Sequence, residues 1–446
     1  MPILRHHRLH IFSLVMFANF LCLSQLSMAD EADNTAQLEQ KIKLLELELQ
    51  KTKQALVEAQ LANKQEVVSH SDQQKSEPAK DDKISFGPLK VGGAMRVNYA
   101  IGDYPEMDGA SRAFEDGGNF ALDTFRINLD YADGPYLGKV EYRWYNGYHF
   151  LHTGWLGYKF DKQRQLQLGV NRVPFGPGAY GISQSWFFDQ HYYLGLSDDM
   201  DLGAKYQHTS GAWQWDFAYY LADEGSYQGA SNDSARYSYD IVNESGDGYE
   251  ERNQFNIRGV YHIDAGNLTT DLGLSLQYSE LKSHGAQDDG DHYAISTHMV
   301  NKWNNFTLAT QLTYYRYDVD SKQSLGTDKL VQMGAYDFPN TVAAEAWIPA
   351  VSLSYNLQTD SIVWLDYVIP YIEYSVLLKQ ESTFNDSEFA TVGAAWGSGS
   401  WFIYTDLSAS NGNEFIGGDE PFGDRLGANA SDDWQTRFNI NFGYYF

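Results

Sequence analysis

The chain has 446 residues, of which 43% are apolar and 15% aromatic, and its formal net charge at pH 7 is -27. A polypeptide this acidic is a poor candidate for nucleic-acid binding, because phosphate contacts require clustered lysine and arginine. Its 32 tyrosines favour a protein with many strands and many rings at an interface.

Residues 1–29 have the composition of a secretory signal peptide. Arg5 and Arg8 supply a positive start, and a small-x-small cleavage site closes the segment. The apolar stretch 11–26 between them is shorter than the roughly 20 residues that cross a bilayer. The only cysteine, Cys22, lies in this segment, so we expect the mature protein to have no thiol.

Residues 30–66 carry a heptad pattern, with Leu38 and Leu45 at one core position and Ile42 and Leu49 at the other. Glu and Lys fill the positions between, and this pattern predicts a coiled-coil oligomerisation segment. A lone amphipathic helix packed on a domain is the alternative. A coiled-coil seam needs partner helices, so we expect an oligomer, and leucine at these positions leaves dimer and trimer both open.

Residues 67–83 are polar and predict a flexible linker, and the pattern changes again at Ile84. From there to the end, apolar and polar residues alternate in short segments, which predicts about 16 strands. The last segment shows the alternation most clearly. Its apolar face consists of Phe438, Ile440, Phe442, Tyr444 and Phe446.

Short turns alternate with long connections in this region, as in outer-membrane barrels. We place the long loops at 102–121, 174–200, 223–251, 318–339 and 409–432. An apolar strand face with nothing to cover it fits a lipid environment, where every backbone group must be paired and the sheet must close. A soluble all-β protein, such as two stacked sandwiches, explains the alternation equally well but not the aromatic ends or the signal peptide.

The sequence therefore predicts an all-β fold, with a 16-stranded antiparallel transmembrane β-barrel over 84–446. An even number of strands brings both chain ends to the periplasmic side, so we expect the α-helical coiled coil to lie in the periplasm.

The order of signal, coiled coil, linker, strands and the closing FNINFGYYF (438–446) resembles Gram-negative trimeric porins. More narrowly, it resembles the phosphate-selective porin O/P group and the related dicarboxylate-type porins with a helical extension. The stretch LGVNRVPFGPGAYGISQSWFFDQHYY (168–193) is similar to the part of that group where a strand enters the loop that folds inward. In that family the final residue, here Phe446, belongs to the tag that the barrel-assembly machinery reads.

The resemblance implies a homotrimer in the outer membrane of a Gram-negative bacterium. Its surroundings would be outer-membrane lipids and lipopolysaccharide, with the coiled coil in the periplasm near the peptidoglycan layer. Small hydrophilic solutes would diffuse passively through each barrel. The resemblance does not fix the solute, and it is the inward charges described next that favour anions such as phosphate or dicarboxylates.

A barrel of this size leaves an aqueous channel, and its inward charges decide which solutes pass. We predict that the pore-lining, anion-binding residues are Arg96, Arg126, Lys139, Arg143, Arg172, Lys205, Arg258 and Arg437. We place the inward acids at Asp130, Glu141, Asp216, Asp271, Glu345 and Glu373. Bases would then be at least as common inside as acids, which favours anions. The alternative is that the arginines pair with neighbouring acids and only brace the wall.

Loop 174–200 is the predicted constriction. A turn at Phe175 can bend it inward, and Ser183, Ser185 and Trp186 would line the narrowest point. An ordinary external loop is the alternative. Acidic stretches in other loops offer oxygen ligands, but a solvated surface facing lipopolysaccharide explains them better, and we predict no metal site.

The sequence shows no nucleophile elbow, phosphate-binding glycine loop or zinc spacing, so we predict no catalytic residue, no cofactor and no enzymatic activity. A lipase-type barrel would need a Ser-His-acid group at the outer lipid boundary, which no strand supplies. A structural tether or adhesin, with the coiled coil as its working part, is the other alternative.

Overall fold

The computed structural model describes residues 84–103, 118–359, 361–416 and 423–446. The predicted signal peptide, coiled coil and linker (1–83) lie outside these residues. Within these ranges no helix has the length and apolar character needed to cross a membrane. The helical structure in the described part is one 3-10 turn, η1 (Tyr192–Leu194).

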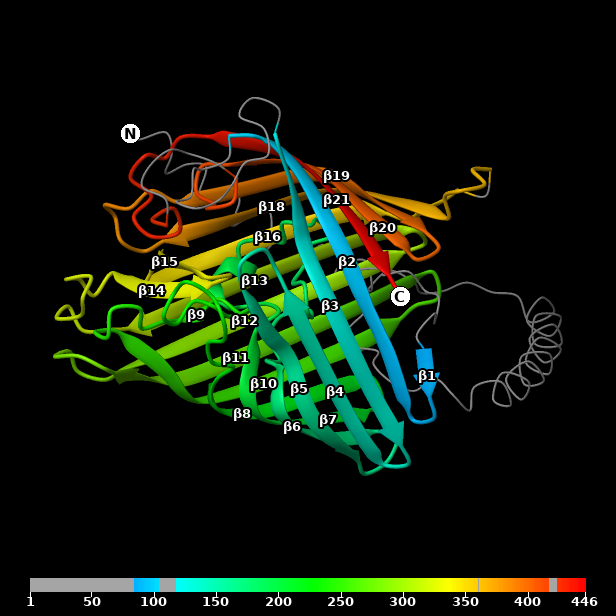
Figure 1. Cartoon of the computed structure of the whole chain (residues 1–446), viewed down its shortest axis with the longest axis horizontal. Coiled ribbons are helices and arrows are strands. Elements are labelled where there is room, and N and C mark those ends of the chain that lie inside the picture. Colours follow the sequence, from blue (N-terminus) through cyan, green and yellow to red (C-terminus); the bar gives the residue numbers. More distant parts are fainter. Residues whose placement is uncertain (1–83, 104–117, 360, 417–422) are drawn as a thin grey trace, which may run out of the picture. The chain divides into compact units, whose positions relative to one another are not determined.

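One antiparallel sheet forms almost the whole structure and closes on itself (Figure 1), which confirms the predicted 16-stranded barrel. The first and last barrel strands, β2 and β21, pair with each other and complete the ring. The 16 barrel strands are β2 (Leu89–Gly102), β3 (Asn119–Asp133), β4 (Tyr136–Trp144), β5 (His149–Lys159), β6 (Arg164–Arg172), β7 (Met200–Ser210), β8 (Trp213–Asp223), β10 (Tyr249–Asp264), β11 (Leu268–Ser283), β12 (Gly290–Trp303), β13 (Phe306–Asp318), β16 (Glu345–Tyr355), β18 (Tyr367–Lys379), β19 (Ser387–Ser398), β20 (Trp401–Ser410) and β21 (Gln435–Tyr445). Two short strands, β1 (Ile84–Phe86) and β17 (Leu357–Gln358), extend this sheet at its margin.

A second, three-stranded sheet is built from the long loops. It consists of β9 (Asp240–Ile241), β14 (Leu330–Ala335) and β15 (Phe338–Ala343). Its last strand, β15, ends at Ala343, and the barrel strand β16 begins two residues later, at Glu345.

The two faces of the barrel wall differ sharply in chemistry. On β10, Phe255 and Ile257 point outward and are 52% and 43% exposed, whereas Asn256 and Arg258, which alternate with them, point inward and are almost fully buried. The outward face repeats this apolar exposure around the ring, for example at Leu156, Leu274 and Ile372. The wall is thus apolar outside and polar inside, the reverse of a protein that folds in water.

The seam between β21 and β2 depends on a glycine. The amide of Gly93 donates to the carbonyl oxygen of Phe446 (2.8 Å), and the amide of Phe446 donates back to Gly93 (3.0 Å). A Cβ at position 93 would lie 2.4 Å from the carbonyl oxygen of Arg126 and 2.6 Å from the ring of Phe446. Only glycine leaves space for the terminal ring at this point.

We expect Gly93→Ala to destabilise the folded barrel by about 1–3 kcal/mol, because its methyl group overpacks the closing seam. The matched control is Gly138→Ala on β4, where an added Cβ meets its nearest atoms at an ordinary 3.6 Å. Thermal unfolding in detergent, followed by circular dichroism, measures both variants. Equal unfolding temperatures for the two would contradict the role of the seam.

Candidate functional site

The connection between β6 and β7, residues 173–199, runs inside the barrel and touches several strands of its wall. Near its start, the amide of Gly176 donates to Ser275 Oγ on β11 (3.1 Å). Arg258 Nε on β10 donates to the carbonyl oxygen of Gly176 (2.7 Å), and its Nη2 reaches that of Pro177 (3.1 Å). The loop is therefore attached to a part of the wall beyond the strands that it connects.

One wall carboxylate, Glu373 on β18, holds the middle of this loop. It accepts hydrogen bonds from Ser183 Oγ (2.7 Å), from the amide of Gln184, and from Ser352 Oγ on β16 (2.9 Å). Burial of a carboxylate is favourable only when its oxygens are satisfied in this way. Glu373 thus positions the loop through charge-assisted hydrogen bonds, which are the stronger kind.

Further contacts hold the following turn. The amide of Trp186 donates to Asp406 Oδ2 on β20 (3.0 Å), and that of Gln190 donates to Ser375 Oγ on β18 (3.1 Å). His191 Nε2 lies 2.8 Å from Thr313 Oγ1 on β13. The loop therefore crosses the interior and reduces its cross-section.

The four residues predicted for the constriction separate into two groups. Ser183, Ser185 and Trp186 lie together, with Ser183 Oγ and Ser185 Oγ 3.0 Å apart and Trp186 against Arg437. Phe175 is buried earlier in the loop, in the main apolar cluster, and lies apart from the serines.

Three of the predicted pore-lining bases form one group on β2, β3 and β4. Arg96 Nε lies 2.8 Å from Asp123 Oδ2. Arg143 Nη2 lies 2.6 Å from Glu141 Oε1, and Arg126 Nη1 lies 3.5 Å from the same oxygen. Lys139 shares the inward face of β4 with Glu141 and Arg143.

The other predicted bases are spread around the ring and each has a partner. Arg172 pairs with Asp198 (2.7 Å) and Arg258 pairs with Asp216 (2.9 Å). Lys205 Nζ donates to the carbonyl oxygen of Arg172 (2.7 Å). Arg437 Nη1 donates to the carbonyl oxygen of Phe415 (2.6 Å) and so contacts the last long loop. Pairing is therefore general among the arginines.

The expected balance of charge in the interior is wrong. Buried inward acids missed in the sequence include Asp201, Asp223, Glu251 and Asp406 on the strands and Asp198, Asp199, Glu224 and Asp240 in the loops. The loop acids were missed because strand alternation does not show which loop residues fold inward. Glu345 is also misassigned, since it accepts a hydrogen bond from the outward-facing Tyr314 (2.6 Å). Acids are thus more numerous inside than expected.

Several of these acids gather around one arginine of loop 224–248. Arg236 Nη1 lies 2.7 Å from Asp223 Oδ2 and 3.4 Å from Asp240 Oδ2. Burial raises the pKa of Asp199 well above its usual range, and repulsion by Glu251 and Glu224 adds to the rise. The only signal for this cluster in the sequence is the acidic run at 198–201, just before β7.

Tyrosines of the constriction loop and of two other loops pack against one another. Tyr192 stacks on Phe188 with ring centroids 4.0 Å apart, and its hydroxyl bonds that of Tyr336. Tyr237 lies edge-on to Tyr336 (5.8 Å) and receives the guanidinium of Arg143 over its ring (4.5 Å). These rings join loops 173–199, 224–248 and 319–344 inside the barrel.

Removal of the Glu373 carboxylate tests whether it holds the constriction loop. We expect Glu373→Ala to speed amide exchange of loop 173–199 by about tenfold, because three donors lose their acceptor. The control is Glu345→Ala, which removes an outward carboxylate. Hydrogen exchange with mass spectrometry measures the peptide directly, and unchanged exchange in the first variant would show that other contacts suffice.

No protein-family model matches the sequence, and no curated protein matches it. Among solved structures, the chain is similar to an anion-selective porin from Comamonas acidovorans, with 13% identity, a TM-score of 0.51, and coverage of 80% of this chain and 99% of that one. It is also similar to the outer-membrane channel DcaP of Acinetobacter baumannii (10% identity, TM-score 0.52, 80% and 97% covered). OmpT, an outer membrane protein of Vibrio cholerae in its trimer form, is similar as well (14% identity, TM-score 0.50, 80% and 99% covered). At such identities the likeness shows a shared fold, the closed barrel of Gram-negative outer-membrane porins and channels.

Proposed function

We propose that this protein is an outer-membrane porin of a Gram-negative bacterium, through which small hydrophilic solutes diffuse passively. The observation that carries the proposal is the closed 16-stranded wall, apolar on its exposed outer face and polar on its inner face. Contact with water costs about 25 cal/mol of free energy for each Å² of exposed apolar surface, so an outer face made of such side chains is far more stable in lipid. Closure leaves no unpaired strand edge within the bilayer.

The interior supports diffusion rather than chemistry. A barrel of 16 strands encloses an aqueous space. Loop 173–199 occupies part of this space, and its hydrogen bonds to the wall fix its position there. In such a channel the solute passes between hydrogen-bonding side chains without a covalent step. The similarity to proteins described as porins and channels supports this function, and the trimer form of one of them supports a homotrimer.

A mild preference for anions is the finer part of the proposal. The sector formed by β21, β2, β3 and β4 carries more bases than acids, and the neighbour described as anion-selective points the same way. The bases on these strands are Lys90, Arg96, Arg126, Lys139, Arg143 and Arg437, and the acids are Asp123, Asp130, Asp133 and Glu141. Because arginines there pair with carboxylates, their field is partly cancelled, and we expect selectivity to be weak rather than absolute. Phosphate and dicarboxylates are the solutes to test first.

Single-channel recording tests the porin function against a purely structural tether. We expect the purified full-length protein in a planar bilayer to give discrete conductance steps, grouped in threes if the protein is a trimer. Each barrel then conducts on its own. A folded preparation that inserts and conducts nothing would overturn the porin proposal and leave the tether.

Neutralising two inward arginines tests the charge selectivity. We expect Arg143→Ala with Arg172→Ala to lower the anion-to-cation permeability ratio by about twofold, because Glu141 and Asp198 lose their counter-charges. The control, Arg316→Ala, removes an outward arginine that pairs with Asp318. Reversal potentials in a salt gradient give the ratios, and an unchanged ratio in the double variant would place both arginines outside the selectivity region.

A further inference from the structure

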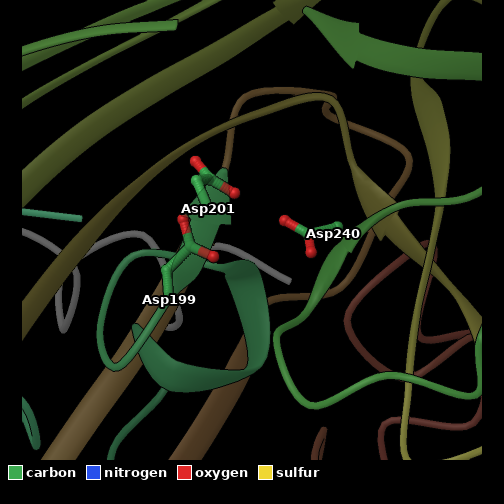
Figure 2. A group of neighbouring side chains, drawn as sticks. All are labelled: Asp199, Asp201 and Asp240. Atoms are coloured by element: carbon green, nitrogen blue, oxygen red, sulfur yellow. The ribbon is translucent and has the colours of Figure 1, made fainter. Parts of the chain in front are cut away.

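Three aspartates converge beside the constriction loop. Asp199 is the last residue of that loop, Asp201 lies at the start of β7, and Asp240 lies on β9 in loop 224–248. One carboxylate oxygen from each lies within 4.8 Å of one from each of the others. Figure 2 shows Asp240 directing its carboxylate across the gap toward Asp199 and Asp201.

Oxygens of this group lack hydrogen-bond partners although the side chains are buried. Among the described residues, no donor reaches Asp199 Oδ1 or Asp201 Oδ1, and these side chains are only 4% and 1% exposed. The side-chain amide of Gln254, next to Asp201, also has, within the described structure, a buried oxygen without a hydrogen-bond donor. Its Nε2 donates to Asp201 Oδ2 (2.6 Å), whereas its Oε1, on a side chain 1% exposed, has no donor. Unsatisfied buried oxygens are costly, so they point to a positively charged occupant.

The positively charged residue beside this group, Arg236, already pairs with several acids. Arg236 is shared by Asp223, Asp233, Asp240 and, at 3.8 Å, Glu224. One guanidinium cannot balance these acids together with Asp199 and Asp201. With all of these carboxylates ionised, the group would carry a large negative charge that Arg236 alone does not balance.

We propose that Asp199, Asp201 and Asp240 bind one Ca²⁺ ion. Calcium takes six to eight oxygen ligands in flexible geometry, and this group offers oxygens alone. Mg²⁺ demands a stricter octahedron and keeps its water, so it fits these converging carboxylates less well.

A bound ion would join three separate parts of the interior. Asp199 belongs to loop 173–199, Asp201 to the wall, and Asp240 to loop 224–248. Through β9, which pairs with β14, the linkage extends to the hairpin of loop 319–344. Calcium would then fix the inner loops to one another and to the wall.

Calcium binding is measured on full-length protein refolded in lipopolysaccharide-free detergent and freed of divalent ions, because lipopolysaccharide itself binds calcium. We expect isothermal titration to give one saturable site per barrel, with an affinity in the submillimolar range, roughly that of extracellular calcium modules. Mg²⁺ should bind at least tenfold more weakly. Calcium should also raise the thermal unfolding midpoint.

The variant Asp199→Asn with Asp240→Asn should lose at least tenfold in calcium affinity and its thermal response to calcium. The control, Asp318→Asn with Asp328→Asn, removes the same charge from exposed acids and should bind as the wild type does. If the double variant does not fold, Asp240→Asn alone replaces it.

Two results would overturn the site. One is the absence of saturable calcium binding by the wild-type protein at concentrations up to about 5 mM, which needs no variant. The other is a double variant that binds calcium as tightly as the control. In either case protons shared among the carboxyl groups would be what compensates the charge.

Discussion

The pairing of β2 with β21 is the interaction on which the rest of the structure depends. Without it, the two terminal barrel strands would expose rows of unpaired amide and carbonyl groups, which lipid cannot satisfy. With it, the outer surface needs only apolar side chains, and every polar group of the wall can turn inward. The enclosed polar space is what makes hydrogen-bonded inner loops possible.

The interior is organised by carboxylates more than by free positive charge. Glu373 and Asp406 accept hydrogen bonds from the constriction loop. Glu141, Asp198 and Asp216 each form an ion pair with an arginine. Paired charges give directional contacts and a polar surface with a modest net field. This arrangement fits a channel that admits a class of solutes better than one that selects a single solute.

The barrel itself was predictable from the sequence because strand alternation reports directly on which face meets lipid. Arg258 was assigned to the inner face by period alone, and it is buried there while its neighbour Ile257 is exposed on the outer face. The long loops carry no such period. Asp240 and Glu224 are buried in the interior through loop folding, so neither the acidic cluster nor the hairpin of β14 and β15 could be read from the pattern.

Four of the attachments of the constriction loop are made by its own backbone amides, and the wall supplies the side chains that accept them. The amides belong to Gly176, Gln184, Trp186 and Gln190, and the acceptors are Ser275, Glu373, Asp406 and Ser375. An amide is present whatever side chain a non-proline residue bears. The side chains of the loop can therefore differ while its amides keep it attached, whereas a change of Ser275, Glu373, Asp406 or Ser375 on the wall removes an acceptor.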